Sequence, residues 1–148
     1  RCGLGKVAEA RGDMAAALEA YRAAARADAQ DPEPLHCLGK LLLDQEDLAG
    51  ARDAYARALR LDADDDVART ELAYVCWALG EREEAAAHYR RLTGGRSASP
   101  QLLYSLGIVE YELGRAREAL QALTRSVRGD AAKADAWRLM ARIYEEQG

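Results

Sequence analysis

The chain has 148 residues, of which 21 are basic and 25 acidic, so its formal net charge at pH 7 is −4. Alanine occurs 32 times and phenylalanine is absent. This composition favours helices, because alanine loses no side-chain entropy in a helix, and it argues against a β-sandwich. No apolar run approaches the roughly 20 residues that a membrane-spanning helix needs, so we expect an all-α protein with no membrane span.

The chain offers little of the chemistry that an enzyme or a metal site needs. Its three cysteines, Cys2, Cys37 and Cys76, are too few and too far apart in the sequence for a disulfide framework or a CxxC metal knuckle. The two histidines, His36 and His88, lie in different segments. His36 and Cys37 are adjacent, and neighbours on a helix point in different directions. The sequence therefore predicts a protein that is not an enzyme, with no catalytic residue, no cofactor and no metal site.

Several kinds of residue recur at intervals of 34 along the chain. The clearest column holds small residues, each preceded by Leu or Met, and consists of Gly5, Gly39, Ala73, Gly107 and Ala141. Three further columns keep the same interval: Ala17, Ala51, Ala85 and Ala119; Tyr21, Tyr55, Tyr89 and Leu123; and Gly12, Glu46, Gly80, Gly114 and Gly148. One period held in separate columns without an insertion indicates a repeat protein.

The period divides the chain into units of two amphipathic helices joined by a turn at the glycine-rich column. In chain order the predicted repeats span residues 1–31, which lack the N-terminal part, then 32–65, 66–99, 100–133, and 134–148, which form only the first helix of a fifth. Neither helix of a unit buries its apolar face alone, so the stability must come from stacking of neighbouring units.

Two features of the later repeats need comment. Glu110 stands in a column where an apolar residue is usual, so we expect a local disturbance in the fourth repeat. In the fifth repeat, Trp137, Met140 and Tyr144 are expected to cover the preceding repeat. Because this last helix carries the full internal pattern rather than a polar variant, we expect the array to continue beyond it.

The columns resemble those of the tetratricopeptide repeat family, whose pattern is Trp-x2-Leu-Gly-x2-Tyr, then Gly, Ala-x3-Tyr or Phe, Ala, and a terminal Pro. The best local matches are the series Trp137, Met140, Ala141 and Tyr144 and the series Gly12, Ala17, Tyr21 and Ala24. The terminal Pro is replaced by Ala29, Ala63, Ser97 and Ala131. The resemblance covers essentially the whole chain and implies a right-handed superhelical solenoid of antiparallel helix pairs.

The resemblance also implies where a partner binds. In this family the first helix of each repeat lines a concave groove that holds a peptide or a partner helix. Carried over column by column, the peptide-binding face consists of Lys6, His36, Lys40, Leu43, Thr70, Tyr74, Trp77, Tyr104, Ile108, Tyr111, Arg138 and Arg142. Its middle is aromatic and apolar and its ends are basic, which predicts an apolar or aromatic peptide with an acidic flank. The predicted function is a non-catalytic protein–protein interaction scaffold.

Two other functions remain open. The chain can be a structural spacer or a self-association segment of a larger multidomain protein, joined through its terminal repeats. A weaker hypothesis concerns arginines on or beside the second helices, which in this family form the convex face: Arg90, Arg91, Arg96, Arg117, Arg125 and Arg128. Such a patch suits nucleic acid or anionic lipid. However, a solvated helix face is the more frequent reason for such a pattern, so we expect no nucleic-acid partner.

Charge and composition add three smaller expectations. Residues 1–80 hold 10 basic and 15 acidic side chains, a net charge of −5, whereas residues 81–148 hold 11 and 10, a net charge of +1. The acidic run at residues 62–66 is expected to form a turn and a helix N-cap rather than a cation site. The excess of arginine over lysine indicates GC-rich, bacterial coding. Localisation stays open, because no leader is readable, with a cytoplasmic location favoured.

Overall fold

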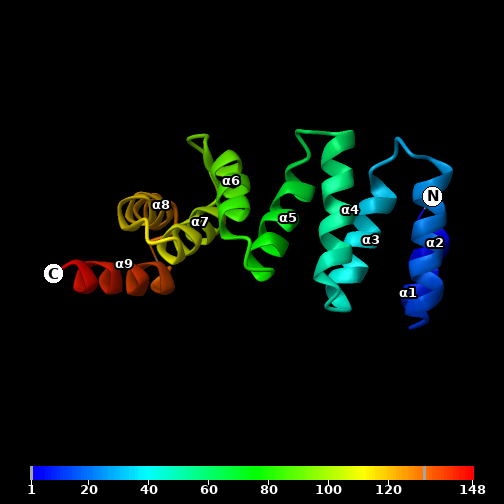
Figure 1. Cartoon of the computed structure of the whole chain (residues 1–148), viewed down its shortest axis with the longest axis horizontal. Coiled ribbons are helices and arrows are strands. Elements are labelled where there is room, and N and C mark those ends of the chain that lie inside the picture. The colour runs from blue at the N-terminus through cyan, green and yellow to red at the C-terminus, as the bar shows by residue number, and fades with distance from the viewer. Residues whose placement is uncertain (1, 132) are drawn as a thin grey trace. The chain divides into compact units, whose positions relative to one another are not determined.

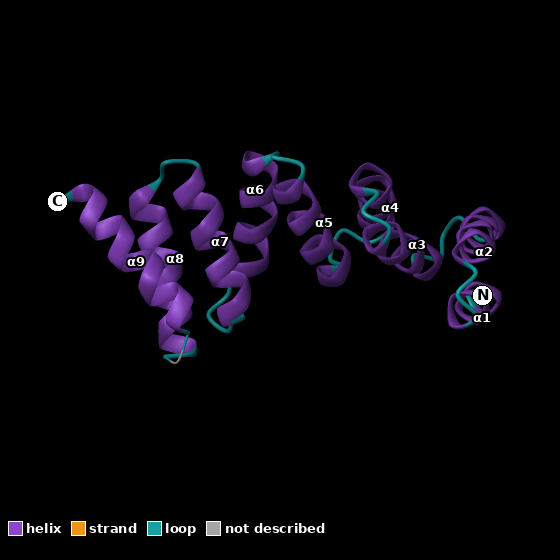
Figure 2. Ribbon diagram, turned by 90° about the horizontal axis from the view of Figure 1, so that it is seen from below, coloured by secondary structure: helices purple, strands orange, loops and turns teal. Residues whose placement is uncertain are grey.

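The computed structural model describes residues 2–131 and 133–148 and is all-α over these residues. Its helices are drawn in Figures 1 and 2. They are α1 (Gly3–Ala10), α2 (Met14–Ala27), α3 (Glu33–Asp44), α4 (Leu48–Leu61), α5 (Asp66–Ala78), α6 (Arg82–Thr93), α7 (Pro100–Glu112), α8 (Ala116–Gly129) and α9 (Ala134–Gln147). None of these helices combines the length and the apolar character that a bilayer crossing requires.

The chain divides into two compact units, residues 1–79 and residues 80–148. The first unit contains α1 to α5, and each of these helices packs on the next one along the chain. The second unit contains α6 to α9, where again each helix packs on the next and α7 also touches α9. Each unit is therefore a run of helices in which neighbours along the chain pack against each other.

The glycine-rich column marks turns between consecutive helices. Gly12, Gly80 and Gly114 have φ angles of 77°, 85° and 74°, in the left-handed region that glycine enters without steric cost. In the second repeat Glu46 takes the same conformation, with φ at 60°. The sharp turn is thus kept even where its glycine is replaced, because the flanking helices impose it.

Aspartates cap several of the helices that follow turns. The side chains of Asp13 and Asp47 accept hydrogen bonds from the backbone N–H groups of Ala16 and Gly50, at 3.0 and 2.9 Å. These bonds satisfy donors that a helix start leaves without an intrahelical partner.

The acidic run at residues 62–66 forms a turn and a helix cap. Its Asp65 side chain accepts a bond of 3.0 Å from the Ala68 N–H at the start of α5. Asp62 accepts one of 3.0 Å from the Asp64 N–H, which closes the turn. The prediction of a turn and N-cap for this run is confirmed.

The column of small residues lets the two helices of a hairpin approach each other. A Cβ added at Gly39 would lie 2.7 Å from ring atoms of Tyr55, whose side chain is buried. One added at Gly107 would lie 2.7 Å from the Leu123 side chain. These distances are shorter than any normal carbon–carbon contact, so glycine is required by close packing between the helices.

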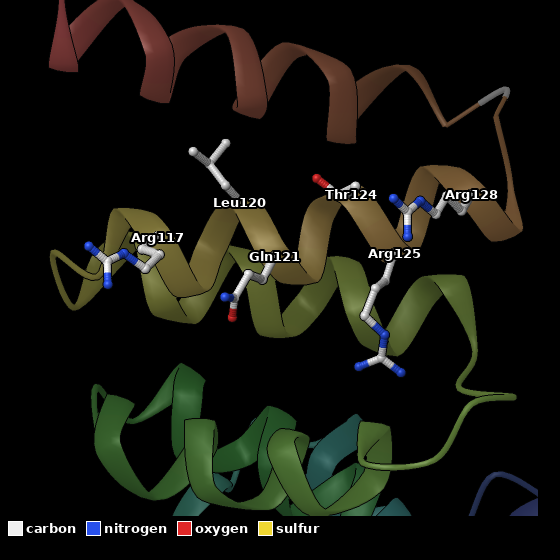
Figure 3. Close-up of a pocket in the computed structure, with 6 residues that line it drawn as sticks. All are labelled: Arg117, Leu120, Gln121, Thr124, Arg125 and Arg128. Atoms are coloured by element: carbon white, nitrogen blue, oxygen red, sulfur yellow. The ribbon is translucent and has the colours of Figure 1, made fainter.

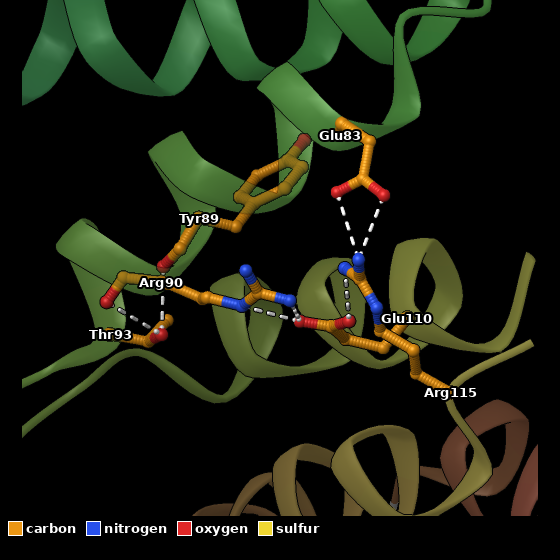
Figure 4. A network of polar contacts seen from close by, with 6 residues as sticks. All are labelled: Glu83, Tyr89, Arg90, Thr93, Glu110 and Arg115. Carbon is orange, nitrogen blue, oxygen red and sulfur yellow. Dashed lines mark hydrogen bonds and ion pairs between the residues drawn. The ribbon is translucent and has the colours of Figure 1, made fainter. Parts of the chain in front are cut away.

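Glu110 does not interrupt its helix. It lies on α7, which runs without a break from Pro100 to Glu112, and its side chain is only 1% exposed. Its Oε1 atom accepts bonds from Arg90, with Nη2 at 2.6 Å and Nε at 2.7 Å, and its Oε2 atom lies 3.5 Å from Nη1 of Arg115. Figure 4 shows this network, in which Arg115 also bonds Glu83 at 2.8 Å. The buried charge is thus paired within the second unit, and the disturbance expected there is confined to side chains.

Candidate functional site

In the first unit the aromatic side chains predicted on α5 lie together on one side of that helix. Tyr74 is 47% exposed, and its ring lies 6.1 Å from the Trp77 ring, tilted by 39°. Trp77 is half-buried. Thr70 is also half-buried, and its hydroxyl donates to the Asp66 carbonyl oxygen of the same helix at 2.7 Å. Tyr74 is therefore the most accessible of the three.

Tyr74 also borders a hollow of about 640 Å³ in the first unit. Its walls come from the end of α3, the turn to α4, the first residue of α4 and the second half of α5. We call it the α3–α5 hollow, and its lining consists of Leu43, Asp44, Glu46, Leu48, Tyr74 and Ala78. We call the half-buried Leu43 and Leu48 its apolar floor and the exposed Asp44 and Glu46 its acidic rim. No basic residue is part of the lining. Such a hollow suits an apolar side chain next to a cationic one.

Sequence reasoning placed Leu43 and Tyr74 on one binding face but missed Glu46 on the rim. The signal for it was the turn column, where Glu46 replaces a glycine. The Glu46 carboxylate therefore lies at the hollow, at a position where the other repeats have glycine and carry no charge.

The predicted polar residues of the first unit differ in their exposure and in whether another side chain already pairs with them. Lys6 is exposed, but its Nζ atom lies 3.2 Å from Glu33, and this hydrogen bond and charge raise the pKa of Lys6. His36 is half-buried, with Nε2 at 2.5 Å from the Asp65 carboxylate and its ring edge-to-face with Tyr55 at 6.3 Å. It therefore joins α3 to α4 and α5 as part of the packing.

Lys40 is exposed on α3. Neither it nor Lys6 belongs to the lining of the α3–α5 hollow.

In the second unit the predicted aromatic residues on α7 are largely occupied by packing. Tyr104 and Tyr111 are half-buried and pack against the core that α8 and α9 form. The ammonium of Lys133 lies 4.9 Å from the centre of the Tyr104 ring, and burial raises the pKa of Tyr104. The Tyr111 hydroxyl donates to Glu146 at 2.7 Å, and this bond raises the pKa of Tyr111. Ile108 is half-buried as well.

On α9 the predicted arginines are both exposed. Arg138 pairs with Asp135 at 2.9 Å, one helical turn away. Arg142 lies near enough to Tyr111 to affect its pKa. These residues belong to the second unit, together with the aromatic residues of α7.

The expectation that Trp137 and Tyr144 cover the preceding repeat is wrong. Met140 is buried, but the other two are 50% and 58% exposed. Helix α9 packs through the side that carries Ala136, Met140 and Ile143. On α3 and α7, the residues at the positions that correspond to Trp137 and Tyr144 are buried. Both of those helices are followed by the second helix of their repeat, whereas no second helix follows α9 in these 148 residues.

A second hollow, in the other unit, is lined by arginines of α8. It measures about 510 Å³, and its lining consists of Arg117, Leu120, Gln121, Thr124, Arg125 and Arg128 (Figure 3). An adjoining hollow of about 590 Å³ shares two of these arginines and adds Arg96. No carboxylate is part of either lining. Within the described part of the chain, neither Arg117 nor Arg128 has an acidic group at ion-pairing distance, so this surface can accept an anion.

Cys2 and Cys37, at the start of the first unit, lie close together although they are distant in the sequence. The Sγ atoms of Cys2 and Cys37 and a carboxylate oxygen of Glu33 are all within 4.8 Å of one another. Burial, and then a hydrogen bond with Cys37, raise the pKa of the Cys2 thiol to about 12. Cys2 is therefore a neutral thiol at pH 7 and a poor nucleophile. The two cysteines are separated by one repeat and one residue, a spacing from which their proximity could have been predicted.

Comparisons with known proteins agree with this architecture. A family model described as "Tetratricopeptide repeat" matches residues 1–32, 38–101 and 104–148. No curated protein matches the sequence significantly. Among solved structures, the fold is similar to a crystal structure of MamA, with a TM-score of 0.90 and 23% identity, over 98% of this chain and 85% of that one.

Two further solved structures are similar in the same way. MamA from Desulfovibrio magneticus RS-1 gives a TM-score of 0.87 at 19% identity, over 98% of this chain and 82% of that one. YrrB, described as a TPR protein with an unusual peptide-binding site, gives 0.86 at 19% identity, over 97% and 74%. At these identities the likeness shows a shared fold.

Proposed function

Because the chain belongs to the tetratricopeptide repeat family, a family of protein-interaction scaffolds, we propose that it is a non-catalytic scaffold that binds a peptide segment of a partner protein. The observation that carries the proposal is the α3–α5 hollow, where the ring of Tyr74 is 47% exposed beside an apolar floor. A large aromatic ring at the edge of a hollow buries much apolar area on binding and loses little conformational entropy.

The charge of the rim bears on which peptide binds there. Asp44 and Glu46 stand beside the apolar floor, so this hollow favours an apolar residue followed by Arg or Lys. The basic residues Lys6, Lys40, Arg138 and Arg142 would instead favour an acidic flank, as the column pattern predicts. We propose the basic flank for this hollow, because the two lysines of the same unit are not among its lining residues.

Tyr74→Ala is expected to weaken peptide binding about tenfold, because it removes the aromatic anchor of the hollow. The probes are short fluorescein-labelled peptides that carry a central Leu or Trp flanked by Arg, and matched peptides flanked by Glu. Fluorescence anisotropy measures the affinities of both sets for the full chain. The Arg-flanked set is expected to bind more tightly.

The matched control is Tyr144→Ala, which removes a similarly exposed tyrosine in the other unit. It should leave the affinity unchanged. Equal affinities of the Tyr74→Ala variant and the original chain would contradict the proposal, and so would an equal loss in the control. Tighter binding of the Glu-flanked peptides would contradict only the proposed basic flank.

A second candidate function is self-association through the terminal helices. Leu4 and Val7 on α1 are 82% and 49% exposed, and on α9 Trp137 and Tyr144 are also exposed. In the second repeat, the columns of Leu4 and Val7 hold Leu38 and Leu41, which are buried. Each terminal helix therefore presents to solvent apolar columns that are covered elsewhere in the chain.

If these faces associate, the chain will sediment as a dimer or larger species at micromolar concentration. Trp137→Gln with Tyr144→Gln should then shift it to the monomer, because polar side chains remove the apolar area that drives association. Analytical ultracentrifugation measures this directly. A monomer for the unsubstituted chain over the whole concentration range argues against the second candidate.

A further inference from the structure

A cluster of three metal-ligating side chains lies where α1 and α3 begin. Cys2 directly precedes α1, Glu33 is the first residue of α3, and Cys37 lies one turn further along α3. Their two Sγ atoms and one carboxylate oxygen are mutually within 4.8 Å. The peptide-binding proposal makes no use of this cluster, because none of the three residues belongs to the α3–α5 hollow.

The donor set has a definite chemical preference. Two cysteine sulfurs select a thiophilic cation such as Zn²⁺ over Mg²⁺ or Ca²⁺, which prefer oxygen ligands. In a tetrahedral zinc site the Zn–S and Zn–O bonds of about 2.3 and 2.1 Å place the ligand atoms roughly 3.5–4 Å apart. Atoms that are already within 4.8 Å reach this geometry by small side-chain rotations.

The surroundings of the cluster allow a cation to enter. Cys2 is 3% exposed, whereas Cys37 is half-buried and Glu33 is exposed, so the cluster is open on the side of α3. The Glu33 carboxylate already attracts one cation, the Lys6 ammonium at 3.2 Å. The side chain of Lys6 is 61% exposed, so it can swing into solvent when a metal ion takes its place.

We propose that Cys2, Glu33 and Cys37 bind a thiophilic divalent cation, with the two sulfurs and one carboxylate oxygen as ligands and water in the fourth position. Each thiol gives up its proton to the buffer when its sulfur binds the metal. The bound ion links the start of α1 directly to α3, so it holds the first helices of two consecutive repeats together and stabilises the first unit.

The test uses Zn²⁺ alone as the probe, with the reduced full chain and a chromophoric zinc chelator as competitor. We expect one equivalent of Zn²⁺ to be withdrawn from the chelator. Cys2→Ser and Cys37→Ser should each abolish this competition, and Glu33→Gln should weaken it less. Replacing Zn²⁺ by Co²⁺ gives a second readout, because thiolate ligation produces sulfur-to-cobalt charge-transfer absorption in the near ultraviolet.

Cys76→Ser is the matched control, since it removes the third cysteine, which lies on α5. It should retain both the competition and the cobalt absorption, and circular dichroism checks that every variant is folded. The proposal is overturned if the reduced chain withdraws no Zn²⁺, if the Cys2 and Cys37 variants compete as well as the original, or if Cys76→Ser alone abolishes binding.

Discussion

Arg90→Ala is expected to lower the free energy of unfolding by about 3 kcal/mol, because it leaves a buried carboxylate without its main partner. The Glu110 side chain is 1% exposed, and Arg90 contacts it at 2.6 Å. After the substitution only Arg115 remains nearby, at 3.5 Å, and it is shared with Glu83. A buried charge that loses its counter-charge keeps the full cost of its desolvation. Urea denaturation followed by circular dichroism measures the change.

The converse substitution, Glu110→Leu, is expected to change the stability by less than about 1 kcal/mol. It removes the buried charge and supplies the apolar residue that stands in the same column of the second repeat, where Leu42 is buried. The side chain of Arg90 is 47% exposed, so it can then be solvated. The double variant should be far more stable than Arg90→Ala alone. Equal losses for both single variants would show that packing, rather than charge pairing, dominates at Glu110.

Gly39→Ala is expected to destabilise the first unit by about 2 kcal/mol, although alanine is ordinarily the better helix former. The added Cβ would lie 2.7 Å from the ring of Tyr55, which is 2% exposed and cannot swing into solvent. The helices α3 and α4 must then separate, and the packing of the whole hairpin loosens. The same urea titration measures the loss.

The control for this prediction is the same substitution at Gly3, on α1. Nothing lies within 4 Å of a Cβ added there, so Gly3→Ala should leave the stability unchanged or raise it by up to about 0.5 kcal/mol through helix propensity. The opposite signs of the two changes separate close packing from helix propensity. A Gly39→Ala variant as stable as the Gly3→Ala variant would contradict the contact between Gly39 and Tyr55.

The repeat pattern was sufficient to predict the class of fold. Columns of Gly, Ala and Tyr that recur at one interval require two helices in each 34-residue repeat and a close contact between these two helices. For the same reason the positive φ angles at Gly12, Gly80 and Gly114 follow from the turn column. The family model supports the same conclusion, since it matches nearly the whole length.

The state of individual side chains was harder to predict, because it depends on neighbours that are distant in sequence. His36 was placed on the binding face, but its imidazole bonds the Asp65 carboxylate at the cap of α5. Tyr111 was placed there too, and its hydroxyl bonds Glu146 on α9. A column pattern shows which side of a helix a residue occupies, but not which polar atom of another helix it meets.

Composition and periodicity alone therefore establish the helical hairpins, their turns and the small residues between the helices. These features depend on local backbone geometry and on contacts that recur in each 34-residue repeat. The pairing of Glu110 with Arg90 and the acidic rim beside Tyr74 each occur once among the described residues. A contact made once leaves no periodic trace along the chain. Such a contact is recognised only in the tertiary structure, where side chains from different helices lie next to each other.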